Sequence, residues 1–248
     1  MKTGISRRSA LMTGTMAVLV PGMEKAAAAP ARAAYDTADG QWRTYGGNLG
    51  SWRYSALDQI NAENFGKLKP AWTFRTDNLG PFPDFNLQAT PLMANGVLYM
   101  TAGARRDAVA IDAATGELIW KFGLEEGRRA RTSPRTGTGR GLSYWTDGTE
   151  ERILYVTIGY QLVCLDARTG RPVESFGDAG VVDLKKDDDQ DIDIDGARTG
   201  DDIGLHASPL VVNDVVVVGE SATRTWFQLA STGAAAISPV ILLLQAVK

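Results

Sequence analysis

An internal repeat is the feature of this sequence that most constrains its fold. The stretch "VLYMT" (97–101) returns as "ILYVT" (153–157), and "IDAATG" (111–116) returns as "LDARTG" (165–170), 54 residues later. A third unit begins at "SPLVVNDVVVVG" (208–219) but lacks the Asp-x-x-Thr-Gly turn. Units of roughly 40–55 residues with about four short strands each are typical of β-propeller blades. The repeat therefore predicts a propeller.

The turns within each unit support this interpretation. Asn95-Gly96 is a typical pair for a tight hairpin turn, and the Asp and Thr side chains of Asp112–Gly116 can bind nearby backbone groups. Trp120 is expected to pack between neighbouring blades; in the second unit Glu174 stands in its place, and Phe176 is its expected substitute. Two chance hairpins in a β-sandwich are the alternative, disfavoured because spacing and residue identities both repeat. The predicted fold class is all-β, a partial β-propeller of about three blades.

Composition restricts the class of protein further. The chain has 248 residues, 44% of them hydrophobic, so it can bury a substantial core. Its formal net charge of -3 shows no excess of basic residues, so nucleic acid is not an expected partner. Cys164 lies in the apolar run "YQLVCLD" and is expected to be a small buried hydrophobe. It is the only cysteine, so a disulfide within one chain is excluded.

The N-terminus reads as a targeting segment. Residues 1–33 begin with a basic stretch, continue with a short apolar stretch and end in small residues with an Ala31-Arg32-Ala33 cleavage site. Arg7-Arg8 resembles a twin-arginine signal; a general secretory signal is the alternative. The apolar stretch is too short for a lasting membrane anchor. We expect the mature chain to begin near Ala34 and to be periplasmic or secreted.

From Gln41 to Ser221 the chain resembles the quinoprotein dehydrogenases, which use pyrroloquinoline quinone (PQQ). The motifs that carry the resemblance are "QWRTYGGNLGSWRYSALDQINAENFGKLKPAWTFRT" (41–76), "QATPLMANGVLYM" (88–100), "RGLSYW" (140–145) and "FGDAGVVDL" (176–184). The resemblance implies that residues 34–221 form roughly three blades of the family's eight-bladed propeller. The repeated turn alone would be less specific, because non-enzymatic propellers also carry it.

The resemblance implies four candidate cofactor-binding residues. Arg140 matches an arginine that binds a PQQ carboxylate or quinone oxygen, and a planar guanidinium suits a carboxylate. Gln88 stands where relatives often carry a glutamate that contacts PQQ. His206, the only histidine, begins the third unit at a PQQ-facing position. Ser221 matches a serine near the quinone, with Glu220 as an alternative from the same strand end. For each residue, an ordinary structural role is the alternative.

The resemblance implies PQQ and calcium as cofactors, but it assigns no catalytic or metal-binding residue in this chain. In relatives the catalytic aspartate, most calcium ligands and the tryptophan stacked on PQQ lie further along the chain. The run "DIDIDGARTGDD" (191–202) fits the start of a calcium loop but lacks flanking helices, so a solvated acidic loop is expected. Residues 222–248 form an atypical tail, which predicts a truncated or frame-shifted product.

The sequence is compatible with two functions. The first is a dehydrogenase that oxidises an alcohol or aldose sugar and passes electrons to a respiratory quinone or cytochrome, represented by a fragment that is inactive alone. The second is a non-enzymatic propeller that serves as a scaffold or binding module in the cell envelope. Either way, three blades leave open propeller edges, which predicts marginal stability or self-association.

Overall fold

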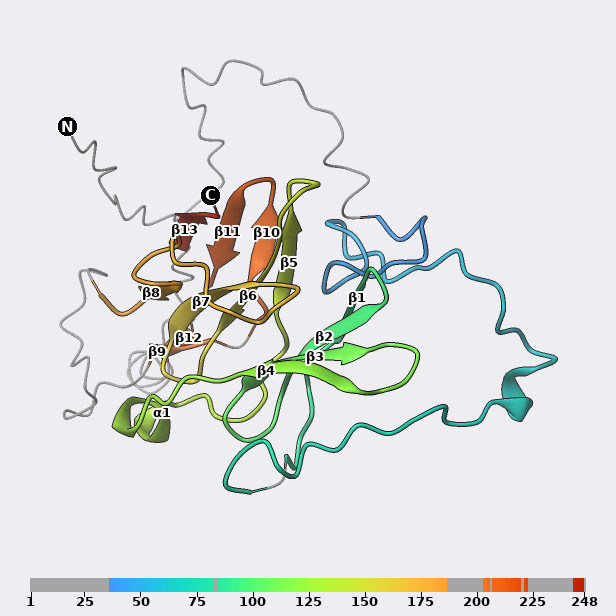
Figure 1. Ribbon diagram of the computed structural model, residues 1–248, viewed down its shortest axis with the longest axis horizontal. Coiled ribbons are helices and arrows are strands. Elements are labelled where there is room, and N and C mark those ends of the chain that lie inside the picture. The colour runs from blue at the N-terminus through green and yellow to red at the C-terminus, as the bar shows by residue number, and fades with distance from the viewer. Residues whose placement is uncertain are drawn as a thin grey trace, which may run out of the picture.

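The computed structural model describes residues 36–82, 84–186, 203–205, 207–219, 221–222 and 243–247. These residues form short antiparallel strands in separate sheets, with very little helix (Figure 1). Two sheets are four-stranded meanders and a third has three strands. The predicted fold class, an all-β partial propeller, is confirmed.

The elements follow one another in chain order. They are η2 (Phe65–Lys67), β1 (Leu92–Ala94), β2 (Val97–Ala102), β3 (Asp107–Asp112), β4 (Leu118–Phe122), α1 (Arg128–Thr132), β5 (Ser143–Thr146), β6 (Glu151–Val156), β7 (Gln161–Asp166), β8 (Val181–Asp183), β9 (Ile203–Gly204), β10 (Leu210–Val212), β11 (Val215–Val218), β12 (Ser221–Ala222) and β13 (Leu243–Ala246). Within the described part of the chain, no helix is long and apolar enough to cross a membrane.

The repeated units share the same turn chemistry. Asn95 lies between β1 and β2 with φ of 52°, and Asn213 lies between β10 and β11 with φ of 53°. In the later turns, Asp112 Oδ1 accepts the Thr115 N–H at 2.8 Å, and Asp166 Oδ1 accepts the Thr169 N–H at 2.8 Å. These hydrogen bonds fix the turn before the fourth strand. The turn chemistry predicted from the repeat is confirmed.

Aromatic side chains join consecutive sheets. Trp120 on β4 is buried, and its indole N–H donates to the Ala167 carbonyl beyond β7 at 2.8 Å. Phe176, before β8, is buried in a cluster that also contains Val211 and Val216 of the third sheet. Trp120 and Phe176 therefore occupy the inter-blade positions predicted for them. Cys164 on β7 is fully buried, as expected.

The third sheet has the order β10-β11-β13. Its last strand pairs antiparallel with β11, from Val215 opposite Ala246 to Val218 opposite Leu243. Residues 243–246, within the predicted tail, thus form the third strand of this sheet. The short strands β9 and β12 pair separately. The predicted signal segment, residues 1–33, lies outside the described residues.

Candidate functional site

Arg140 lies in the connection before β5, beside the segment that carries Gln88. The Thr90 N–H donates to the Arg140 carbonyl at 3.2 Å. Gly141 permits this approach: its φ is 120°, and a Cβ there would lie 3.2 Å from the Thr90 carbonyl oxygen. The side chains of Gln88 and Arg140 are both exposed. The structure therefore brings together the segments of two candidates that are 52 positions apart in the sequence.

A cavity of about 240 Å³ opens beside Arg140. Three separate segments form it, and its lining comprises Arg43, Thr44, Tyr45, Gly46, Asn48, Ser51, Arg140, Ser143, Tyr144, Ala207, Ser208, Pro209, Leu210 and Val211. Strands β5 and β10 lie side by side here (Figure 1), and the Ser143 hydroxyl donates to the Pro209 carbonyl across them. The cavity thus lies where the second and third sheets meet.

The polar lining of the cavity is cationic. The Tyr45 phenol hydrogen-bonds to Arg53 and Arg140, and the Arg53 guanidinium carbon lies 5.1 Å from the centre of the Tyr45 ring. The hydrogen bond with Arg53 is the main cause that lowers the pKa of Tyr45; burial opposes it, and the hydrogen bond with Arg140 adds to it. Arg43 forms an ion pair with Asp39 at 2.8 Å. This lining favours an anionic ligand.

One hydroxyl at the cavity is unpaired. Thr44 lines the cavity with only 8% of its surface exposed, and its Oγ1 is buried without a hydrogen-bond partner within the described structure. Such groups are rare because the lost hydration costs about 1–3 kcal/mol. A carboxylate accepting from this hydroxyl would satisfy it. Sequence reasoning missed Arg43, Thr44 and Tyr45, although all three lie in the "QWRTYGG" motif.

A buried arginine holds the loop that leads to Arg140. Arg106 follows β2 and is 4% exposed. Its guanidinium donates to the carbonyls of Arg135 and Gly137 at 2.9 Å each, and to those of Val156 and Thr157 at 3.3 and 3.2 Å. Burial lowers the pKa of Arg106 to about 10, so it remains protonated at neutral pH. The loop is therefore anchored to both four-stranded sheets.

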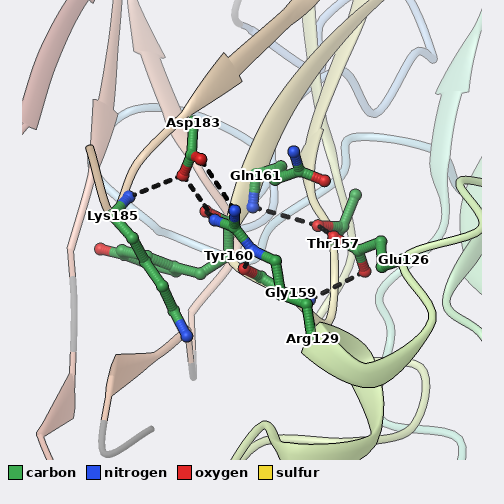
Figure 2. Close-up of polar contacts among 8 residues, drawn as sticks. All are labelled: Glu126, Arg129, Thr157, Gly159, Tyr160, Gln161, Asp183 and Lys185. Carbon is green, nitrogen blue, oxygen red and sulfur yellow. Dashed lines mark hydrogen bonds and ion pairs between the residues drawn. The ribbon is translucent and has the colours of Figure 1, made fainter. Parts of the chain in front are cut away.

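A second polar network fixes the start of the same connection (Figure 2). The Glu126 carboxylate accepts the Thr157 hydroxyl at 2.6 Å and the Gly159 N–H at 2.8 Å. Arg129 on α1 binds both oxygens of Asp183 at 2.8 and 2.5 Å. Burial raises the pKa of Asp183, but the hydrogen bonds from Arg129 outweigh it and the net pKa is lowered. Both ends of the β4–β5 connection are thus held against the second sheet.

The structure does not describe the side chains of three predicted residues. His206 lies outside the described residues, as does Glu220. Ala207 and Ser208, which follow His206, line the cavity. Ser221 belongs to β12, but its side chain lies outside what the structure describes. The roles of Gln88, Arg140, His206 and Ser221 toward PQQ therefore stay predictions.

The described residues do not form a metal site. Among them, no group of three or more His, Cys, Asp or Glu side chains is placed to hold an ion. The acidic run at 191–202, predicted to be a solvated loop, lies outside the described residues. The part of the chain that the structure describes thus offers a cavity between the segments 43–51, 140–144 and 207–211, with Arg43 and Arg140 as the charged side chains of its lining.

The antiparallel sheets and the contacts between them define a partial β-propeller, and comparison with known proteins gives its family. Residues 42–236 match the family described as "PQQ: Glucose/ethanol/alcohol dehydrogenase, beta-propeller domain". The chain belongs to this PQQ dehydrogenase family, as the sequence resemblance predicted. The predicted cofactors, PQQ and a metal ion such as calcium, agree with this membership.

Individual relatives are similar over part of their length. The glycerol dehydrogenase large subunit of Gluconobacter oxydans is 32% identical over 76% of this chain and 26% of its own. The dehydrogenase subunit of the quinone alcohol dehydrogenase of the same species is 39% identical over 55% of this chain and 17% of its own length. The quinohemoprotein alcohol dehydrogenase ADHIIG of Pseudomonas putida HK5 superposes with a TM-score of 0.61 and 29% identity, covering 80% of this chain and 26% of that chain. The chain thus spans about a quarter or less of these relatives.

Proposed function

We propose that this chain is the N-terminal part of a periplasmic PQQ dehydrogenase that oxidises an alcohol or an aldose sugar. Its own contribution is to bind PQQ in the cavity beside Arg140. The observation that carries the proposal is the convergence of Arg43, Tyr45 and Arg140 with the unpaired hydroxyl of Thr44 on one cavity. The similarity to alcohol, glycerol and glucose dehydrogenases supports the substrate class.

The residues present fit PQQ as a ligand. PQQ carries carboxylates, and a guanidinium binds a carboxylate through two parallel hydrogen bonds. Arg140 is exposed and lines the cavity, so its guanidinium can reach a ligand there. The Thr44 hydroxyl is one further donor. The role of these residues is to bind and orient the cofactor, and the two anchors of the β4–β5 connection keep Arg140 in place.

PQQ, when bound, supplies the two-electron acceptor for oxidation of the substrate hydroxyl group. The described residues that line the cavity include no carboxylate and no histidine that could take up the hydroxyl proton. We therefore assign them cofactor binding rather than proton transfer, and we expect the chain to be inactive alone. A respiratory quinone or cytochrome would accept the electrons, and calcium would be held by residues other than those described here.

The proposal is tested by measuring PQQ binding to the Arg140→Gln variant. Loss of one charge-assisted hydrogen-bonding group costs about 1.5–3 kcal/mol, so the dissociation constant should rise roughly 10- to 100-fold. The measurement is equilibrium dialysis of the full chain with PQQ. The matched control is Arg168→Gln, because Arg168 is an exposed arginine on the 165–170 turn, away from the cavity lining.

Two outcomes would contradict the proposal. The first is equal PQQ affinity for the original chain and Arg140→Gln. The second is no saturable PQQ binding by the original chain, which would favour the non-enzymatic scaffold. Dye-linked oxidation of alcohols and aldoses with PQQ and calcium added is the companion assay, and the chain alone is expected to give no turnover.

A further inference from the structure

The turn between β1 and β2 contains the only Asn-Gly pair of this sequence, Asn95-Gly96. Both residues are exposed in the described structure, and both have positive φ, of 52° and 81°. A Cβ at Gly96 would meet no atom within 4 Å, so the space around this backbone position is open. None of the described groups accepts the Gly96 N–H. The backbone nitrogen of Gly96 is therefore both unbound and unshielded.

Asn95 also joins the first sheet to the second. Its side-chain Nδ2 donates to Glu151 Oε1 at 2.6 Å, and Glu151 begins β6 of the second sheet. The backbone N–H of Asn95 donates to the Gln41 side chain at 2.7 Å. Both hydrogen bonds lie at exposed positions, where polar contacts are weak. The tip of this hairpin can therefore open locally without unfolding of the sheets.

We propose that Asn95 is a site of spontaneous deamidation, and that its modification turns the hydrogen bond with Glu151 into a repulsion between the two sheets. The first part of this proposal rests on the residue that follows. A glycine has no side chain to shield its backbone nitrogen from the preceding asparagine side chain. It also lets the backbone pass through conformations that other residues seldom adopt, which the attack on the side chain requires.

The reaction consumes only water. The Gly96 nitrogen loses its proton to hydroxide and bonds to Asn95 Cγ, while the bond from Cγ to Nδ2 breaks. Nδ2 takes a proton from water and leaves as ammonia, which returns the hydroxide. Water then opens the cyclic imide: cleavage at Cγ gives aspartate, and cleavage at the main-chain carbonyl gives isoaspartate. Asparagine and water thus become one of these two acids and ammonia, and nothing is oxidised or reduced.

The product places two carboxylates against each other. Aspartate at position 95 replaces the donor that lies 2.6 Å from Glu151 Oε1 by a charged acceptor. Glu151 is also held by a hydrogen bond from the Tyr144 phenol, so it has a second contact that keeps it in place. Like charges directly opposite each other destabilise a pairing. The modified chain therefore loses a contact between its first and second sheets that the original chain has.

The third sheet provides an internal comparison. Asn213 lies between β10 and β11, is exposed and has φ of 53°, close to that of Asn95. Both hairpins close through the same two-residue connection. The residue after Asn213 is Asp214, whose side chain shields its backbone nitrogen and whose charge opposes loss of the N–H proton. We therefore expect Asn213 to react far more slowly than Asn95.

The first measurement is peptide mass spectrometry of the full chain, kept without PQQ at mildly alkaline pH. The peptide that contains Asn95 should gain about one mass unit with time and separate into an aspartate and an isoaspartate form. Asn213 should stay unmodified over the period in which half of Asn95 is converted. Gly96→Asp copies the pair found in the third sheet and should suppress the reaction. An unmodified Asn95, equal conversion of Asn213, or an unchanged rate in Gly96→Asp would each overturn the proposal.

The second measurement tests the repulsion, by thermal unfolding of Asn95→Asp followed by circular dichroism. The melting temperature should fall by roughly 2–4 °C, as expected for loss of one such contact in a chain of this size. In a chain that also carries Glu151→Gln, the same substitution should have little effect, because glutamine is uncharged and can donate to the new carboxylate. Equal losses in the two backgrounds would overturn the proposed repulsion. Neither measurement uses PQQ, so their failure leaves the proposed function untouched.

Discussion

At the scale of single residues, the candidate site depends on a few arginines with different roles. Arg140 faces the cavity and can bind a ligand, whereas Arg106 is buried and binds only backbone carbonyls. Arg106 also has φ of 57°, a conformation that residues other than glycine seldom adopt. The hydrogen bonds from the Arg106 guanidinium to four backbone carbonyls explain why an arginine is tolerated in this backbone conformation. We assign Arg106 to positioning of the loop that leads to Arg140.

The Arg106→Met variant tests this assignment. It leaves several buried carbonyls without donors, so the free energy of unfolding should fall by about 2–4 kcal/mol. Chemical denaturation followed by circular dichroism measures this change. The matched control is Arg105→Met, because Arg105 pairs with Glu125 at the surface and its side chain is 48% exposed. Such surface pairs contribute about 0–1 kcal/mol. Equal stabilities of the two variants would contradict the positioning role.

The sequence predicts the candidate site only in part. Arg140 and Gln88 could be predicted as site residues because they lie in the family-like motifs "RGLSYW" and "QATPLMANGVLYM". The structure brings the segments that carry them together. Tyr45 and Thr44 could not be chosen, because the cavity forms only when residues 43–51 meet β5 and β10. That contact depends on how separate sheets pack, and local turn chemistry carries no information about it.

At the scale of elements, the contact between consecutive blades is a tryptophan packed on a glycine turn. Gly170 has φ of 69°, and a Cβ there would lie 2.5 Å from the Trp120 ring. The repeated turn therefore requires glycine for two reasons: its backbone conformation and the close approach of the aromatic ring. The same arrangement recurs between Gly116 and Trp72, where the distance is also 2.5 Å.

A pair of glycine variants separates these two reasons. Gly170→Ala should lower the free energy of unfolding by about 2–4 kcal/mol, from backbone strain and from overpacking against Trp120. Gly96→Ala is the control, since Gly96 has φ of 81° but no atom within 4 Å of its Cβ position. In Gly96→Ala the free energy of unfolding should fall only by the contribution of backbone strain, about 1–2 kcal/mol. Urea denaturation measures both, and equal losses would contradict the packing role of Trp120.

The hairpins and the Asp-x-x-Thr-Gly turns could be predicted because their residues act within a few positions of each other. The pairing of β13 with β11 could not, because the 24 residues between Val218 and Leu243 carry no turn motif. The position of residues 71–75 could not be predicted either. Their place depends on the Trp72 contact with a turn about 40 residues away.

At the scale of the whole molecule, the chain is an arc of sheets with a cationic cavity between the second and third. It spans about a quarter or less of the relatives reported above. Family membership fixes the fold and the class of cofactor, whereas substrate and location rest on the proposals.

The central claim is that the cavity beside Arg140 binds PQQ, and a crystal structure of the full chain with PQQ tests it most directly. The account predicts electron density for PQQ in this cavity, with a carboxylate or quinone oxygen within hydrogen-bond distance of the Arg140 guanidinium. PQQ bound elsewhere, or a cavity without PQQ at a saturating concentration, would contradict it.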